Sequence, residues 1–131
     1  MNELAKEILD TVEVGALATV NVDRTPLVTP LHFARLGDSI VWISEPTARH
    51  SENAFRNGKA EFVVWDDKKR AVFLKTNVTE LPESEKEAAM AAYKEKLADF
   101  IPRCQNPQIY VAPIGELDEK TTTGNWLHFI A

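Results

Sequence analysis

The stretch GALATVNVDRTPLVTPLHFARLGDSIVWIS, residues Gly15–Ser44, decides how this chain folds. It holds three segments, 15–22, 27–36 and 39–44, in which small, β-branched and other apolar residues predominate, as is typical of strands. Polar turns separate the segments, and Gly37-Asp38 makes the second turn very short. Because short turns join antiparallel neighbours, the sequence predicts three strands that follow one another as an antiparallel meander.

The segments on either side of this stretch add helices and further strands. Leu4, Ile8 and Val12 share one face of a first helix, and the longest helix runs from Pro82 to about Phe100. The other predicted elements are a short helix at 47–56 and strands at 59–65, 70–81, 108–117 and 121–131. This pattern predicts an α+β fold, mainly β, built round a small barrel as one domain over residues 1–131.

Composition limits the partners that the chain can have. The 131 residues include 20 acidic and 15 basic ones, and the net charge of −5 argues against a nucleic-acid-binding protein, which needs a basic patch. A single cysteine, Cys104, excludes an internal disulfide and a cysteine-based zinc site. The sequence has no apolar run of ~20 residues and no signal peptide, so we expect a soluble, cytoplasmic protein without a membrane span.

The stretch WISEPTARHSEN, Trp42–Asn53, gathers hydroxyl, guanidinium and imidazole groups where a strand meets a helix. The first backbone N–H groups of a helix lack internal partners, so this step is a natural phosphate site. The side chains suited to phosphate oxygens are Ser44, Thr47, Arg49 and His50. Other interpretations stay open, because Arg49 can pair with Glu45, His50 can face water, and either hydroxyl can simply cap the helix.

The ordered features from Ala16 to Trp65 resemble a known family. The stretch ALATVNVDRTPLVTPLHFARLGDSIVWISEPTARHSENAFRNGKAEFVVW contains LATV, a turn, P-x-V-T-P-x-x-F, and a strand that ends in serine before an Arg-His step into a helix. It is similar to the core of the pyridoxamine 5′-phosphate oxidase-like, FMN-binding split-barrel family. The resemblance implies a six- or seven-stranded antiparallel split β-barrel with peripheral helices, a homodimer, and FMN in grooves at the dimer interface.

The resemblance also implies roles for individual residues. It gives Arg49 a role in binding the FMN phosphate, and it puts His50 where the family often has lysine. The strand that it implies under the flavin ring is 28–32, with Thr29, Pro30, Leu31 and His32 as the contacts, although a histidine at position 32 can also simply face the barrel surface. Pro30 cannot donate to a strand ladder, so nearby backbone groups are free for the polar edge of the ring, unless this is an edge-strand proline without a ligand.

The size of the barrel predicts association. A small barrel is filled by its own side chains, so a flavin has to bind outside it in a groove. A second protomer related by a two-fold axis can supply the missing walls of that groove. Trp42, Trp65 and Trp126 are candidates to cover the interface or the ring. Core packing is the stronger interpretation for the first two, whereas Trp126, beside Gly124-Asn125, is the better ligand candidate.

Metal and nucleophile chemistry find little support. His32, His50 and His128 form no metal-binding motif, so we expect no metal site. Cys104 follows Arg103, which can lower the pKa of the thiol, but a lone loop cysteine is usually inert.

Two classes of function therefore remain. One is an FMN-dependent oxidoreductase that uses a small-molecule electron donor and reduces a small acceptor. The alternative is a non-catalytic protein that binds or senses a flavin, haem or deazaflavin. Genuine pyridoxamine phosphate oxidases end in an R-L-H-x-R pattern, whereas Leu127-His128 here lies in NWLHFI with no flanking arginine. We therefore do not expect oxidation of pyridoxamine phosphate.

Overall fold

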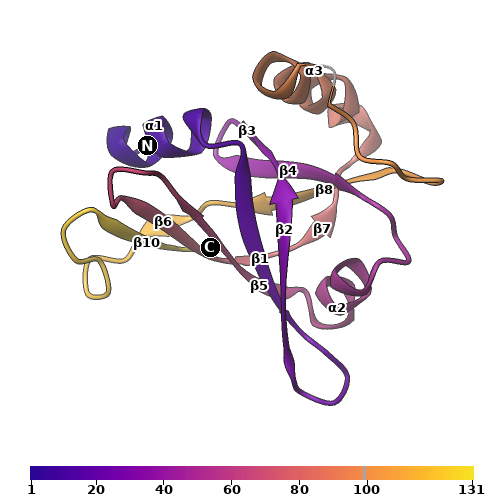
Figure 1. Ribbon diagram of the computed structural model, residues 1–131, viewed down its shortest axis with the longest axis horizontal. Coiled ribbons are helices and arrows are strands. Elements are labelled where there is room, and N and C mark those ends of the chain that lie inside the picture. The colour runs from indigo at the N-terminus through magenta and orange to yellow at the C-terminus, as the bar shows by residue number, and fades with distance from the viewer. Residues whose placement is uncertain (99) are drawn as a thin grey trace.

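The computed structural model describes residues 1–98 and 100–131. This part of the chain contains ten strands and three α-helices (Figure 1). The strands are β1 (Val14–Val20), β2 (Pro26–His32), β3 (Ala34–Leu36), β4 (Ser39–Ser44), β5 (Lys59–Trp65), β6 (Ala71–Asn77), β7 (Thr79–Glu80), β8 (Gln108–Pro113), β9 (Glu116–Leu117) and β10 (Trp126–Ile130). The helices are α1 (Glu3–Thr11), α2 (Arg49–Asn57) and α3 (Lys86–Leu97), and the 3-10 turn η1 (Glu83–Glu85) leads into α3.

The strands form two sheets. The six-stranded sheet has the order β2-β1-β5-β6-β10-β9, and the four-stranded sheet has the order β3-β4-β8-β7. The predicted mainly β, split-barrel fold with peripheral helices is confirmed. The expectation of purely antiparallel pairing is wrong at one place, because β10 runs parallel to β6. A parallel neighbour needs a long connection, which the chain supplies through α3, β8 and β9.

Three of the predicted strands are each divided between the two sheets. The segment 27–36 becomes β2 and β3, 70–81 becomes β6 and β7, and 108–117 becomes β8 and β9. At each division a backbone N–H leaves the ladder for a distant carbonyl: Phe33 donates to Glu13 at 3.2 Å, Val78 to Gly58 at 2.8 Å and Ile114 to Asp38 at 2.9 Å. The predicted antiparallel pairing of successive segments is confirmed, because β2 pairs with β1 and β3 pairs with β4. The expectation of one continuous meander is wrong, because the middle segment is divided between the two sheets.

The helix ends also differ from the prediction. The helix predicted at 47–56 begins two residues later, at Arg49, and Gly58 ends it as expected in the left-handed region, with φ of 73°. The longest predicted helix starts as η1, and its α-helical part ends at Leu97. Position 99, within the range of that prediction, lies outside the described residues.

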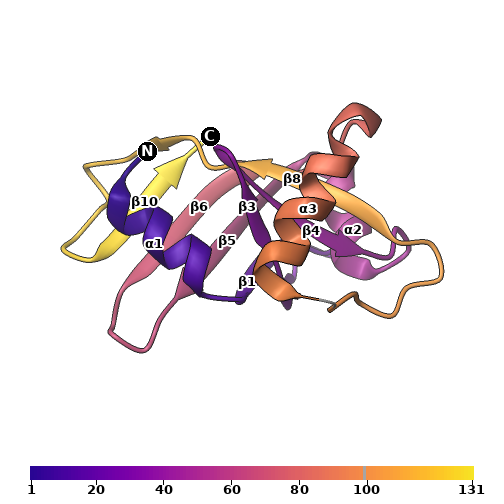
Figure 2. The same ribbon diagram turned by 90° about the horizontal axis from the view of Figure 1, so that it is seen from above.

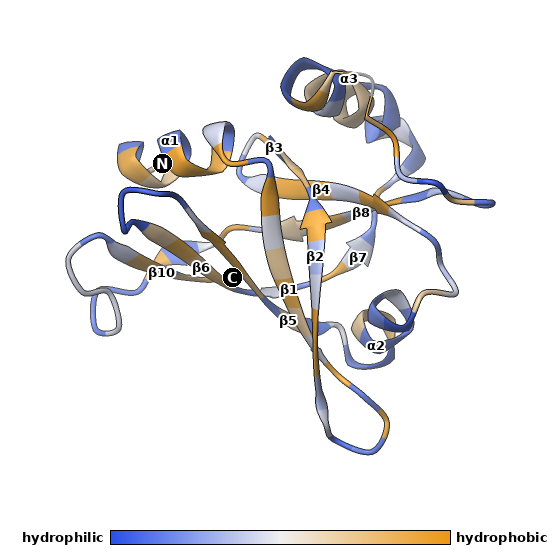
Figure 3. Cartoon of the chain, viewed as in Figure 1, coloured by the Kyte–Doolittle hydropathy of each residue, from blue (hydrophilic) through white to orange (hydrophobic). Residues whose placement is uncertain are grey.

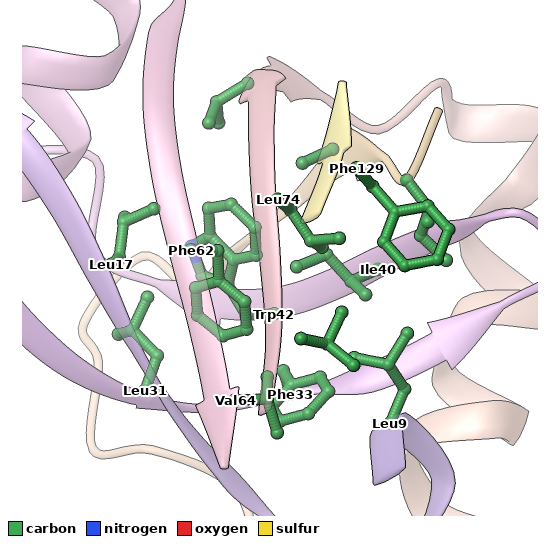
Figure 4. Packing of buried hydrophobic residues seen from close by; sticks show 14 of the residues in the cluster. Leu9, Leu17, Leu31, Phe33, Ile40, Trp42, Phe62, Val64, Leu74 and Phe129 are labelled. Carbon is green, nitrogen blue, oxygen red and sulfur yellow. The ribbon is translucent and has the colours of Figure 1, made fainter. Parts of the chain in front are cut away.

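The main core lies between the two sheets, and α1 closes one end of it. Figure 4 shows Trp42 from β4 beside Phe62 from β5, with Leu9 of α1 at the border of the same cluster. Figure 3 shows hydrophobic residues concentrated on the central strands and hydrophilic ones in the turns. Trp42 is 1% exposed, so core packing is confirmed for it, whereas Trp65 is 55% exposed on the outer face of β5 and the same interpretation is wrong.

The helices lie at different places round the sheets. α1 and α3 lie on the same side of the molecule, and α2 lies away from them beside the β1–β2 hairpin (Figure 1 and Figure 2). Tyr93 and Leu97 of α3 pack with Val41 and Ile43 of β4 in a second, smaller core. No helix in the described ranges is long and apolar enough to cross a membrane.

Candidate functional site

A pocket of about 310 Å³ lies between β2, the end of β4 and the start of α2, and we call it the β2–α2 pocket. Its lining is Thr29, Pro30, Leu31, His32, Ile43, Ser44, Glu45, Ala48, His50, Phe100, Pro102 and Cys104. Six of the nine residues predicted as cofactor contacts lie here, four from β2 and two from the strand-to-helix step. The fold thus brings together two sequence segments that were singled out for different reasons, one for a ring and one for a phosphate.

The β2 wall of the pocket is the edge of the six-stranded sheet. β2 pairs with β1 on one side, and within the described residues it has no strand partner on the other. Pro30 pairs across from Ala16, and Leu31 next to it is buried. A proline without an N–H is tolerated at such an edge, as predicted. The pocket therefore has a flat wall with backbone groups that no neighbouring strand uses.

The polar end of the pocket is a pair formed by Ser44 and His50. Ser44 ends β4 and is only 5% exposed, and its hydroxyl lies 2.9 Å from the Nε2 atom of His50. Ala48, the N-cap residue of α2, is extended and offers no side-chain hydrogen bond to the helix. The first N–H groups of α2 are thus left without a side-chain cap, and such groups favour an anion.

Burial sets the protonation of the two most reactive groups here. It lowers the pKa of His50, so the imidazole is neutral at pH 7. Burial also raises the pKa of the Cys104 thiol, and the carboxylate of Glu45 raises it further. The lower thiol pKa that Arg103 suggested is therefore wrong, and Cys104 stays a thiol.

Arg49 lies just outside the β2–α2 pocket. It is exposed and faces an adjoining polar hollow of about 420 Å³, together with Asn53 and Arg56 of the same helix and Asp23 of the β1–β2 turn. The hydroxyl of Thr25 lowers the pKa of Asp23 most, and the positive charge of Arg49 contributes a smaller part. Arg49 is thus one residue from the pocket but points to the other side of the helix start.

Two further predicted contacts lie elsewhere. Thr47 is exposed and is not part of the pocket lining. Trp126 is 54% exposed on β10 and packs on Phe73 with ring centroids 5.7 Å apart. The structure does not bring either residue into the β2–α2 pocket of its own chain.

Sequence reasoning missed the wall that follows α3. Phe100, Pro102 and Cys104 line the pocket, and the Phe100 ring lies 4.0 Å from the ring of His32. Phe100 was predicted as the approximate end of the longest helix, although the apolar pair before Pro102 in an otherwise polar loop was a usable signal. Across residues 1–98 and 100–131, no group of three or more His, Cys, Asp or Glu side chains could hold a metal ion.

Two sheets, with the open edge strand β2 beside the uncapped start of α2, define the chain as a split-barrel protein whose β2–α2 pocket has an apolar wall and a polar end. The family model described as Pyridoxamine 5′-phosphate oxidase matches residues 1–113, and the chain belongs to this family. No curated protein matches the sequence.

Solved structures with this fold bind different cofactors. A haem-binding protein from Mycobacterium smegmatis has a TM-score of 0.72 at 21% identity, over 86% of this chain and 50% of that one, so this chain spans half of its length. The haem storage protein HutZ from Vibrio cholerae has a TM-score of 0.71 at 15% identity, over 86% and 88%. An FAD-binding protein from Mesorhizobium loti has a TM-score of 0.69 at 20% identity, over 87% and 88%.

Proposed function

We propose that this chain is a flavoprotein that binds FMN in the β2–α2 pocket and passes electrons to a small acceptor. The observation that carries the proposal is the Ser44–His50 pair, which lies at the uncapped start of α2 and faces the same pocket as the free edge of β2. One pocket thus combines donors for a phosphate with a flat wall for a ring.

The groups in the pocket suit the two halves of FMN. The Ser44 hydroxyl, the His50 imidazole and the first N–H groups of α2 can donate to phosphate oxygens. Arg49 lies at the first turn of α2, and its long side chain can add a charge-assisted bond from the rim. The apolar side chains of Pro30, Leu31 and Phe100 can exclude water from a planar ring.

We also propose that the active form is a homodimer formed through the outer face of the six-stranded sheet. The register gives a row of outward residues across the sheet: Pro30, Ala16, Val63, Phe73 and His128. The large exposed apolar side chains on the same face are Val14, Val20, Val28, Trp65, Trp126 and Ile130. Exposed apolar faces of this kind mark association sites. In a dimer with two-fold symmetry, the same face of each protomer would cover that of the other.

The dimer would also complete the cofactor site. Pro30 belongs both to the outward row and to the lining of the β2–α2 pocket, so a partner on this face lies next to the pocket. At about 310 Å³ the pocket is at the lower end of the usual range for ligand sites, roughly 300–1,000 Å³. A second protomer can supply the missing walls, and Trp126 on the same face is the candidate to reach across.

The chemistry would come from the cofactor, since bound FMN supplies the transfer of electrons. The chain's own residues bind its phosphate, orient its ring and keep water away. Oxidation of pyridoxamine phosphate is not expected, because no arginine flanks Leu127-His128 and the His128 ring lies flat on Phe73 at 4.2 Å.

Haem is the second candidate ligand. Two of the similar structures above are described as haem proteins, and His32 and His50 give the pocket two imidazoles of the kind that bind haem iron. The lowered pKa of His50 keeps its imidazole neutral, as an iron ligand must be. In that case the chain would bind the cofactor without flavin turnover.

The test compares FMN with riboflavin, which lacks the phosphate. We expect apoprotein to bind FMN more tightly in a fluorescence titration, and Ser44→Ala to reduce FMN affinity without changing that for riboflavin. Ser39→Ala, at the other end of β4, is the matched control. Equal affinities for the two flavins would contradict the proposal. Reduction of ferricyanide or a quinone by reduced nicotinamide, with pyridoxamine phosphate and oxygen as a parallel assay, then separates the enzyme from a binder.

A further inference from the structure

Phe100 contributes an aromatic ring to the wall of the β2–α2 pocket, although it belongs neither to β2 nor to α2 but to the loop after α3. Its ring centroid lies 4.0 Å from that of His32, with a tilt of 33° between the rings. Its backbone N–H donates to the carbonyl of Leu97 at 3.1 Å, which ties it to the end of α3. Although it contacts the pocket, its side chain is still 43% exposed. The ring therefore forms part of the pocket wall and is also partly open to solvent.

Lys96, in the last turn of α3 and four residues before Phe100, holds this end of the helix in place. The Lys96 amine donates to the carbonyl of Leu9 at 2.8 Å and lies 3.6 Å from the centre of the Phe33 ring. Leu9 is in the last turn of α1, which has no basic residue of its own there, so Lys96 supplies the positive charge that a helix C-terminus favours. Burial lowers the pKa of Lys96 to about 8, and the amine stays mainly protonated at pH 7.

Lys96 and Phe100 thus hold α3 against two successive residues of the chain. Lys96 covers Phe33, and Phe100 covers His32, the residue before it. Because His32 ends the β2 wall of the pocket and Phe33 follows it in the core, the packing of α3 on these two residues sets the position of the Phe100 ring. A side chain held in this way can discriminate between ligands by size.

We propose that Phe100 is the residue that determines cofactor specificity in the β2–α2 pocket, because its ring leaves room for the flat tricyclic ring of a flavin but not for a porphyrin. This inference rests on the proposed cofactor site. A porphyrin joins four pyrrole rings into a wider plate than an isoalloxazine, and the Phe100 ring, 4.0 Å from the His32 ring, occupies part of the space that such a plate would need beside β2. Removal of the Phe100 ring would widen the pocket and uncover His32, an imidazole that can bind haem iron.

The experiment titrates the full-length wild type, Phe100→Ala and Ile101→Ala with FMN and with haemin. Ile101 is the matched control, because it is a neighbouring apolar residue, 50% exposed, that is not part of the pocket lining. We expect Phe100→Ala to lose about tenfold in FMN affinity and to gain about tenfold in haemin affinity, read from the Soret band. Ile101→Ala should match the wild type for both ligands.

Phe100→Leu keeps an apolar side chain in the same place and guards against a folding defect in the alanine variant. We expect its ratio of haemin to FMN affinity to lie between those of the wild type and Phe100→Ala. An unchanged ratio in both variants would overturn the inference, and so would tighter binding of haemin than of FMN by the wild type. A wild type that binds neither ligand would instead overturn the proposed function, so the two failures are distinguishable.

Discussion

His50 is the residue that gives the proposed phosphate site its own character. The family that the sequence resembles often has lysine here, and lysine stays charged, whereas burial lowers the pKa of His50 and leaves it neutral at pH 7. A bound phosphate favours the protonated imidazole, so binding raises the pKa of His50 and takes up a proton. Affinity for the phosphate must therefore rise as the pH falls, until the pH is below the pKa of the free protein.

We accordingly expect the ratio of FMN to riboflavin affinity to increase from pH 8 to pH 6. The FMN phosphate itself gains a proton near pH 6, at about the second pKa of a phosphate monoester, so the comparison needs His50→Lys as a control. The lysine variant should show a ratio that is higher at pH 8 and follows only the phosphate. Parallel pH profiles for the two proteins would exclude His50 from the site. The measurement is a set of fluorescence titrations with both flavins.

Arg49 gives a second prediction at the residue scale. Its side chain is exposed and forms no ion pair with Glu45. The carboxylate of Glu45 instead accepts a hydrogen bond from the backbone N–H of Asn106 at 3.1 Å. If Arg49 turns to the phosphate when FMN binds, Arg49→Ala should lose one charge-assisted hydrogen bond, about 1.5–3 kcal/mol, and leave riboflavin affinity unchanged. Lys68→Ala, in the exposed β5–β6 turn, removes the same net charge far from the site. Equal FMN affinity in wild type and Arg49→Ala would remove Arg49 from the site.

At the scale of elements, the sequence predicted the strand-to-helix step at Ser44 because that signal is local. Hydroxyls, a proline and an arginine lie within one short stretch, and the β4–α2 step appears there within two residues of the expected bounds. Which side chain faces the pocket could not be predicted in the same way. Neighbouring residues on a helix are about 100° apart, so Arg49 and His50 face different sides. Which of the two faces the pocket depends on how α2 packs on the sheet, through contacts such as that of Asn53 with Thr19.

The division of three predicted strands between the two sheets could not be predicted for a related reason. The alternation from Leu27 to Leu36 fits one long strand, but the chain changes sheets at Phe33, whose N–H donates to the Glu13 carbonyl. That partner is remote in the sequence and belongs to the α1–β1 connection. Phe100 illustrates the same limit at the site, because its neighbour His32 lies far along the chain. Local sequence patterns therefore specify the helices and strands. Contacts between residues far apart in the sequence specify where a strand passes from one sheet to the other, and they bring Phe100 to the pocket wall.

Asn53 is the contact that fixes α2 on the sheet. It is 3% exposed, and its amide nitrogen donates to the Thr19 hydroxyl at 3.2 Å and to the Asn21 side chain at 2.9 Å. Its amide oxygen also accepts a hydrogen bond from Arg56. Asn53→Ala would leave these partners unsatisfied in a partly buried place and should cost about 1–3 kcal/mol of folding free energy.

Urea unfolding would measure this loss, with Glu52→Ala on the exposed side of the same helix turn as the control. We also expect Asn53→Ala to weaken FMN more than riboflavin, because α2 carries the phosphate end of the proposed site. A variant with unchanged stability would show that the hydrogen bonds of Asn53 do not hold α2 in place.

At the scale of the whole molecule, the outer face of the six-stranded sheet connects assembly with cofactor binding. Val63 lies near the centre of that face, paired across to Ala16 on one side and Phe73 on the other. Its side chain points away from the core, so Val63→Glu should leave the fold intact but place a charge in the middle of the proposed interface. A buried unpaired charge is among the costliest changes that an interface can suffer.

We expect sedimentation of the flavin-loaded wild type to give about twice the mass of the 14.7 kDa chain, and Val63→Glu to give a mass near one chain. Val22→Glu, at the tip of the β1–β2 hairpin and 83% exposed, adds the same charge away from the face and should remain a dimer. Because the partner is proposed to complete the pocket, Val63→Glu should also lose at least about tenfold in FMN affinity. A wild-type monomer with flavin still bound would contradict the dimer. A Val63→Glu dimer would show that the interface lies on another face, and a Val63→Glu monomer with full FMN affinity would show that one chain holds the whole site.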